Sequence, residues 1–153
     1  MKTLRFAVLG AGFWANFQIP AWMELEGVEL VALSDRTKSK AEILARKYSV
    51  PSGYDDVQQL LETERLDFVD IITDVDTHAA ITEAAARKGI AVICQKPMAP
   101  TLSAAIKMVE VCQIQHVPFF IHENFRWQAP IRKLKSLLDS EVIGKVFKAR
   151  VTF

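Results

Sequence analysis

The most constraining feature of this 153-residue chain is a short apolar run that leads directly into a glycine-rich turn. Residues 6–9 read Phe-Ala-Val-Leu, and Gly10, Ala11 and Gly12 follow them before a segment with helical character. This succession predicts a strand, a tight turn and the N-terminus of a helix. Helix N-termini present unpaired N–H groups, and glycine lacks a side chain that would keep a phosphate from the backbone. The turn is therefore a candidate pyrophosphate site, with Ala15 at the third small position of G-x-G-x-x-G/A.

A second apolar run, residues 28–33, ends shortly before an acidic residue. Asp35 follows Gly12 by 23 residues, near the spacing of about 20 expected for a carboxylate that binds the adenosine ribose. We favour this role for Asp35 over that of a turn or helix-cap residue. Arg36 is expected either to lie on the adenine face or to attract a 2′-phosphate. Because Asp35 would repel such a phosphate, the sequence favours NAD, with NADP left open.

Bulk composition argues against several classes of function. The chain is about one domain long, and half of its residues are hydrophobic, which is ordinary for a globular protein. A net charge of +1 without a basic stripe makes nucleic acid an unexpected partner. Cys94 and Cys112 form no metal-binding or disulfide pattern, so we expect no metal site and a reducing cytoplasm. No apolar run approaches the roughly 20 residues of a membrane span.

Strand-like and helix-like segments alternate along the chain. This alternation predicts an α/β fold, a doubly wound parallel sheet with helices on both faces. The expected strands are residues 6–9, 28–33, 68–72, 90–94 and 117–121, with a short one within 50–54. The expected helices after the first are residues 38–48, a short one capped by Asp55 or Asp56 and running to 61, 76–88, one from Thr101 or Ser103 to about 115, and 128–138.

The last ten residues differ from the rest. Residues 144–153 alternate apolar and polar side chains, which predicts a long strand with no partner in the sequence before it. Unpaired strand edges attract other strands. We therefore expect this segment to be poorly ordered or to pair with another chain, as the first strand of a missing α+β domain. The predicted domains are 1–125, which binds the nucleotide, and 126–153, a linking helix and the start of a truncated substrate or oligomerisation domain.

Further motifs follow the glycine turn and the Asp35-Arg36 pair in a fixed order. They are Thr73 with His78, Lys88-Gly89, Lys96-Pro97-Met98-Ala99, Asn124-Phe125-Arg126-Trp127 with Pro130, and Ile143-Gly144-Lys145-Val146. With this set, which covers nearly the whole chain, the sequence resembles the Gfo/Idh/MocA oxidoreductases. The resemblance implies a Rossmann sheet in the order 3-2-1-4-5-6 and NAD(P)-dependent chemistry at a CH–OH group of a sugar, inositol or related polyol.

The resemblance also implies roles for individual residues. Lys96 matches a lysine that assists proton transfer and touches the nicotinamide ribose, and it is the expected catalytic residue. Phe13 and Trp14 are expected mainly to pack, and they could also wall the pyrophosphate site. The expected cofactor-binding residues are Gly10, Ala11, Gly12, Phe13, Trp14, Asp35, Arg36, Thr73, His78, Gln95, Lys96, Asn124 and Arg126. For His78, a helix-capping or solvent-facing role is an equal alternative.

The chain departs from the family pattern in three ways. Gln95 stands where the family usually has Glu, which removes a negative charge that would favour a protonated Lys96. Asp74-Val75 replaces a step that usually contains proline. We expect the family's second domain, which completes the substrate pocket, to be missing from this chain. We therefore expect cofactor binding with little turnover by this chain alone, and a homo-oligomer for the full-length protein. The alternatives are a non-catalytic NAD(P)-binding or sensing module and, third, an S-adenosylmethionine-dependent methyltransferase.

Overall fold

The computed structural model describes residues 2–152. The chain divides between His122 and Glu123 into two compact units. The first unit contains a sheet, and its six strands are all parallel in the order β3-β2-β1-β4-β5-β6. The strands are β1 (Leu4–Leu9), β2 (Val28–Ser34), β3 (Ser52–Tyr54), β4 (Phe68–Ile71), β5 (Ala91–Gln95) and β6 (Phe119–His122). The expected doubly wound order is confirmed.

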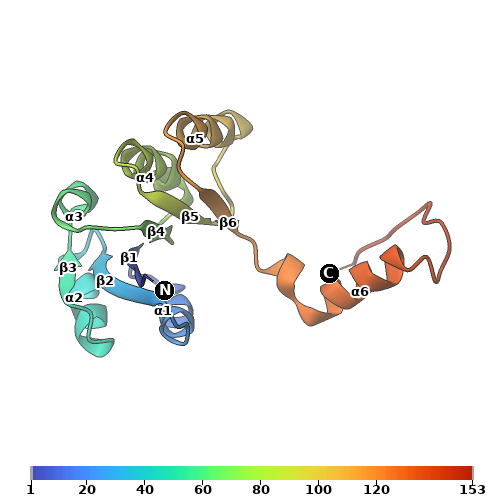
Figure 1. Ribbon diagram of the computed structural model, residues 1–153, viewed down its shortest axis with the longest axis horizontal. Coiled ribbons are helices and arrows are strands. Elements are labelled where there is room, and N and C mark those ends of the chain that lie inside the picture. The colour runs from blue at the N-terminus through green and yellow to red at the C-terminus, as the bar shows by residue number, and fades with distance from the viewer. Residues whose placement is uncertain (1, 153) are drawn as a thin grey trace. The chain divides into compact units, whose positions relative to one another are not determined.

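Helices cover both faces of this sheet (Figure 1). They are α1 (Ala15–Met23), α2 (Lys38–Lys47), α3 (Val57–Thr63), α4 (Val75–Arg87) and α5 (Leu102–Ile114). The side chain of Asp56 accepts a hydrogen bond from the Gln59 N–H and caps α3, and the Thr101 hydroxyl caps α5 in the same way. Expected and observed bounds agree within two residues, because capping residues and glycines fix helix ends locally.

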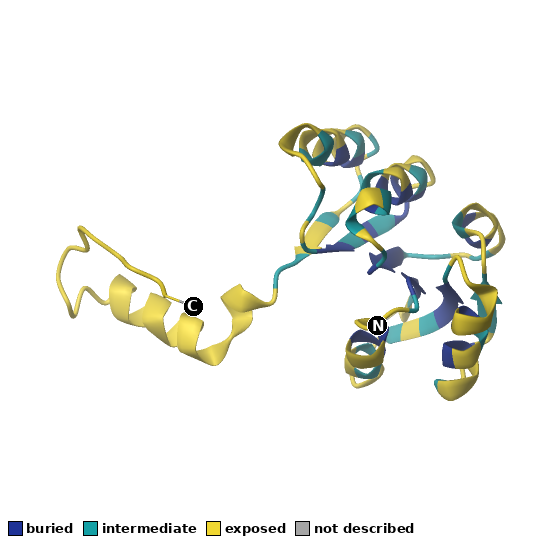
Figure 2. Cartoon of the chain, turned by 180° about the vertical axis from the view of Figure 1, so that it is seen from behind, coloured by how far each residue is buried: buried dark blue, intermediate teal, exposed yellow. Residues whose placement is uncertain are grey.

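The core has two layers, one on each side of the sheet. Successive side chains of a strand point to opposite faces, and β1 follows this rule. Ala7 and Leu9 pack with residues of α3, α4 and α5, whereas Phe6 and Val8 pack with residues of α1 and α2. Both faces of the central strands are therefore buried, as Figure 2 shows in dark blue. This double burial explains why these strands read as continuous apolar runs.

The second unit contains a 3₁₀ turn, η1 (Phe125–Trp127), and α6 (Ala129–Asp139) with Pro130 in its first turn. The strand expected over residues 144–153 is wrong for the described part of that segment. Residues 144–152 are exposed and contain no strand, and residue 153 lies outside the described residues. A strand is stabilised by hydrogen bonds to a neighbour, and no strand within residues 2–152 pairs with this segment.

Candidate cofactor site

The two glycines of the turn after β1 serve different purposes. Gly10 has φ +116°, and a Cβ at this position would lie 2.8 Å from the Ile72 carbonyl oxygen at the end of β4. A side chain is therefore excluded by the fold itself. A Cβ at Gly12 would meet nothing within 4 Å. The absence of a side chain at Gly12 leaves space beside the start of α1, which is where an anion would approach the helix N-terminus.

Asp35 joins the loops that follow β1 and β2. Its carboxylate accepts hydrogen bonds from the backbone N–H of Ala11 at 2.9 Å and of Thr37 at 2.8 Å. Asp35 can therefore both hold the turn and bind a ligand. A carboxylate offers about four lone-pair positions, and the two backbone N–H groups use two of them. The remaining positions can accept from ribose hydroxyls, and the carboxylate is held rigidly beside the glycine turn.

A cavity of about 420 Å³ lies at this place. It is lined by Gly10, Gly12, Asp35, Arg36, Thr37, Lys40, Ile72, Thr73 and Asp74. These residues come from the carboxyl ends of β1, β2 and β4 and from the start of α2. Because β2 and β4 flank β1 on opposite sides, the connections diverge there, and such a switch point is the usual ligand crevice of an open α/β sheet. A neighbouring hollow of about 220 Å³ shares Asp35, Arg36, Thr73 and Asp74 with this cavity.

Lys96 directly follows β5 and is half-buried. Its ammonium nitrogen lies 5.8 Å from the centre of the Trp14 ring, within the range of a cation–π contact. Trp14 is the N-cap residue of α1, and Phe13 meets it edge-on with ring centres 5.7 Å apart. Both aromatic side chains are exposed. The expected catalytic lysine therefore lies near the start of α1, and a wall of Phe13 and Trp14 at the pyrophosphate site stays a prediction.

A buried polar network lies beneath Lys96. Asp70 on β4 is fully buried, and both of its carboxylate oxygens accept from the Gln18 side-chain amide, at 2.9 and 2.8 Å. The Trp22 indole N–H donates to the same carboxylate at 2.6 Å. Burial raises the pKa of Asp70, while the bonds from Trp22 and Gln18 and the nearby His122 ring oppose the rise. In the sequence, Asp70 stands out only as an interruption of an apolar strand.

The network reaches Gln95 through Gln18. The Gln18 amide nitrogen also donates to Nδ1 of His122 at 2.8 Å, and its oxygen accepts from the Gln95 amide nitrogen at 3.3 Å. The Gln95 oxygen in turn accepts from the Lys96 backbone N–H at 2.8 Å. Because the Asp70 carboxylate only accepts, it fixes which way Gln18 points and therefore requires a donor at position 95. An amide side chain meets that requirement, and an ionised carboxylate does not.

His78 is buried rather than solvent-facing or capping, so that alternative is wrong. Its Nδ1 lies 3.2 Å from the Met98 carbonyl oxygen and its Nε2 lies 3.1 Å from the Thr73 carbonyl oxygen. A carbonyl oxygen only accepts, so each of these contacts is a hydrogen bond when the ring nitrogen carries the proton. The ring ties the loop after β4 to the turn after Lys96. Its contact with a cofactor stays a prediction, as do those of Asn124 and Arg126, which belong to the second unit.

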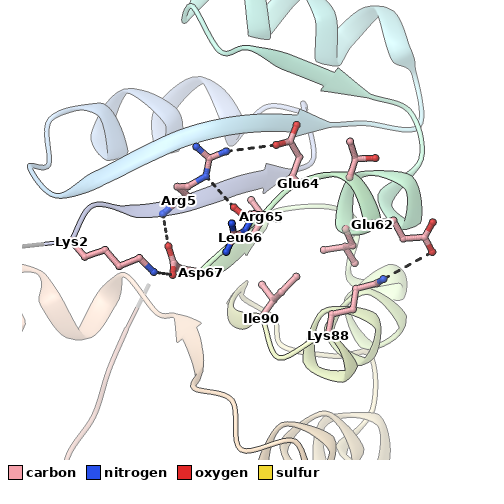
Figure 3. A pocket seen from close by; sticks show the side chains of 11 residues that line it. Lys2, Arg5, Glu62, Glu64, Arg65, Leu66, Asp67, Lys88 and Ile90 are labelled. Atoms are coloured by element: carbon pink, nitrogen blue, oxygen red, sulfur yellow. Dashed lines mark hydrogen bonds and ion pairs between the residues drawn. The ribbon is translucent and has the colours of Figure 1, made fainter.

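A larger hollow of about 950 Å³ lies at the opposite edge of the sheet, by the amino ends of β1, β4 and β5 (Figure 3). Six of its charged side chains pair with one another: Lys2 with Asp67 at 2.7 Å, Arg5 with Glu64 at 3.8 Å, and Lys88 with Glu62 at 4.0 Å. Ligands of open parallel sheets bind at the carboxyl edge. We therefore assign no cofactor role to this hollow.

Two further features are absent from residues 2–152. No group of three or more His, Cys, Asp and Glu side chains is placed to hold a metal ion. No helix in the same residues has the length and apolar character needed to cross a membrane.

Known proteins match this chain over 93% to 100% of its length. D-apiose dehydrogenase of Rhizobium rhizogenes is 39% identical over 153 residues, which are 100% of this chain and 44% of that protein. D-xylose 1-dehydrogenase [NADP(+)] of Haloarcula marismortui is 31% identical over 93% of this chain and 41% of its own length. A crystal structure of an Agrobacterium radiobacter oxidoreductase in complex with NAD+, L-tartaric acid and magnesium has 38% identity and a TM-score of 0.91, over 94% of this chain and 42% of that one.

The chain thus spans less than half the length of these relatives. A family model described as an oxidoreductase family with an NAD-binding Rossmann fold matches residues 4–123. This match favours a nicotinamide cofactor over S-adenosylmethionine. The chain belongs to the Gfo/Idh/MocA oxidoreductase family, and residues 4–123 are its NAD-binding Rossmann domain.

Proposed function

We propose that this chain binds NAD for an oxidoreductase that acts on a CH–OH group of a sugar, inositol or related polyol. Residues 1–125 form the nucleotide-binding domain, and residues 126–153 form the linking helix and the beginning of a substrate or oligomerisation domain. The dehydrogenases of apiose, xylose and inositol among the relatives support the substrate class. NAD is the preferred cofactor and NADP the second choice.

One observation carries the proposal. Open space at Gly12 lies beside an acceptor, Asp35, that is already held by two backbone N–H groups. The pyrophosphate fits the open space at Gly12, and the ribose hydroxyls fit the Asp35 carboxylate. Since both belong to the lining of one 420 Å³ cavity, the residues present suit a dinucleotide. Thr73 lines the same cavity.

The bound nicotinamide would supply the hydride acceptor or donor. The chain's own contribution is then proton handling and exclusion of water. We assign to Lys96 the role of holding a proton at its Nζ and exchanging it with a substrate hydroxyl or carbonyl, and the Trp14 ring, 5.8 Å from that nitrogen, would stabilise the ammonium. Hydride transfer also requires a substrate held in near-attack geometry. We propose that segments of the longer protein complete this pocket, so the present chain turns over little substrate.

Calorimetric titration of the chain with NADH and with S-adenosylmethionine tests cofactor binding. We expect saturable binding of NADH alone. A Gly12→Leu variant adds a side chain whose Cβ meets no atom within 4 Å, so its melting temperature should stay near that of the wild type while NADH affinity falls at least about tenfold. A folded wild-type chain that does not bind NADH would contradict the proposal.

A second candidate function is a non-catalytic NAD(P)-binding or sensing module. The neutral Gln95 beside Lys96 favours it, because the charge that would promote a protonated lysine is absent. Lys96→Ala in the longer protein separates the two. If Lys96 is catalytic, its replacement by alanine should lower kcat by about 10²-fold or more and leave cofactor affinity nearly unchanged. Equal turnover by the variant and the wild type would favour the binding module.

We also propose the setting in which the longer protein works. The buried free cysteines, Cys94 and Cys112, suit a reducing compartment, and we assign the protein to the cytoplasm. The partner is a small polyol or sugar-like substrate, and neither nucleic acid nor a membrane is assigned. We also assign a homo-oligomeric state to the longer protein. A measurement of its mass in solution tests this assignment.

A further inference from the structure

The lining of the cofactor cavity includes an exposed ion pair that the cofactor assignment does not require. Arg36, in the loop after β2, donates to the carboxylate of Asp74, in the loop after β4, at 2.9 Å. Both side chains line the 420 Å³ cavity and the neighbouring 220 Å³ hollow. The pair therefore spans the place where the adenosine part of a dinucleotide would lie beside Asp35.

The orientation of Asp74 is unusual for its position in the helix. Asp74 is the N-cap residue of α4, and an aspartate there commonly accepts a hydrogen bond from a backbone N–H of the first turn. The Asp74 side chain makes no such bond. Its carboxylate is turned to Arg36 instead, so the helix gives up a local interaction and the carboxylate is placed at the cavity.

The charges of the cavity balance as a result. Asp35 and Asp74 oppose Arg36 and Lys40 in its lining. A 2′-phosphate adds nearly two negative charges to this place and would need cationic partners. Arg36 is the natural one, because a guanidinium binds a phosphate through two parallel hydrogen bonds. That guanidinium already has an anionic partner in Asp74.

We propose that Asp74 is a cofactor-selectivity residue that excludes NADP by neutralising and holding Arg36. This inference rests on the proposed NAD site and adds a second determinant to the repulsion from Asp35. It also gives a role to the departure from the family's proline-containing step at Asp74-Val75.

The test compares dissociation constants for NAD⁺ and NADP⁺ by calorimetry at low salt in the wild type, Asp74→Asn and Asp76→Asn. Asparagine keeps the shape and the N-cap preference of aspartate. Asp76 is the matched control, because it lies in the same first turn of α4, is exposed and lines neither hollow. Its substitution removes the same charge from the same helix end without freeing Arg36.

Because both side chains of the pair are largely exposed, we expect Asp74→Asn to lower the ratio of the NADP⁺ to the NAD⁺ dissociation constant about threefold to fivefold. This decrease in the ratio should be smaller at 0.5 M salt, because the Debye length there is about 4 Å and the charges are screened. It should vanish when Arg36→Gln is added to Asp74→Asn. Asp76→Asn should keep the wild-type ratio within about twofold. Binding of NAD⁺ with an unchanged ratio in Asp74→Asn, or an equal change in Asp76→Asn, overturns this inference alone. Failure of the folded wild type to bind either nucleotide overturns the proposed function and this inference together.

Discussion

Replacing Gln95 with glutamate tests the buried network most sharply. In the native chain the Gln95 nitrogen donates to Gln18 and its oxygen accepts from the Lys96 N–H. A carboxylate at position 95 can still accept from the Lys96 N–H, but it cannot donate to Gln18. Its second oxygen would instead face the side-chain oxygen of Gln18. Gln18 cannot rotate its amide in response, since its nitrogen is committed to Asp70 and His122. The variant therefore places a second buried carboxylate in a network that already holds the fully buried Asp70.

The expected cost follows from the pKa of the new side chain. A carboxyl at position 95 should have a folded-state pKa above the unfolded value of about 4.3, because burial and Asp70 both oppose its ionisation. A raised pKa destabilises the fold above pH 4.3 by at most about 1.36 kcal/mol per pH unit, so the ceiling is about 3.7 kcal/mol at pH 7 and about 1.6 kcal/mol at pH 5.5. We expect a loss of about 2–3.5 kcal/mol at pH 7.

Urea denaturation followed by circular dichroism at pH 7 and pH 5.5 measures this loss. The protonated carboxyl of the Gln95→Glu variant can donate to Gln18 as the amide does, so the free energy of unfolding should approach that of the wild type at the lower pH. Gln59→Glu makes the same substitution at an exposed position of α3 and should change stability by less than about 0.5 kcal/mol. A Gln95→Glu variant as stable as the wild type at pH 7, or a loss that is equal at both pH values, would refute the reasoning.

Three other predictions concern the glycine turn, its carboxylate and the cysteines. Gly10→Ala should destabilise the fold by at least about 1–3 kcal/mol, because its Cβ would lie 2.8 Å from the Ile72 oxygen at φ +116°; a melting temperature equal to that of the wild type contradicts this. Asp35→Asn should weaken NAD binding by about 1.5–3 kcal/mol, measured by calorimetry, since an amide cannot accept at both of its ends; unchanged affinity contradicts it. Burial, with Asp70 and Cys112, raises the pKa of Cys94 to about 12, so at pH 8 a thiol reagent should label neither cysteine in the native chain and both after unfolding; rapid native labelling contradicts it.

The fold and the cofactor turn are predictable from the sequence because their signals are local. Apolar runs, capping residues and the Gly10–Gly12 turn each act over a few residues, and the double burial of a parallel sheet follows from those runs. The spacing of Asp35 is also a local property of one strand-helix-strand unit. These features predict from the sequence alone that the Asp35 carboxylate lies beside the turn.

The buried network could not be predicted, because its contacts are long-range. Gln18 and Asp70 are 52 residues apart, and Gln18 and His122 are 104 apart. No periodicity indicates which polar side chains will meet beneath a sheet edge. The same holds for Arg36 and Asp74, which meet only because β2 and β4 flank β1. The error over residues 144–153 has the related cause that a strand pattern does not contain the partner that a strand needs.

Amide chemical-shift mapping during an NAD⁺ titration tests the central claim most directly. We expect the largest changes at residues 10–14, 35–37 and 72–74, around the cavity at the carboxyl edge of the sheet. The amides of Arg5, Asp67 and Lys88, around the larger hollow at the opposite edge, serve as an internal control and should not move. Shifts confined to that opposite edge, or no shifts at saturating NAD⁺, would contradict the account.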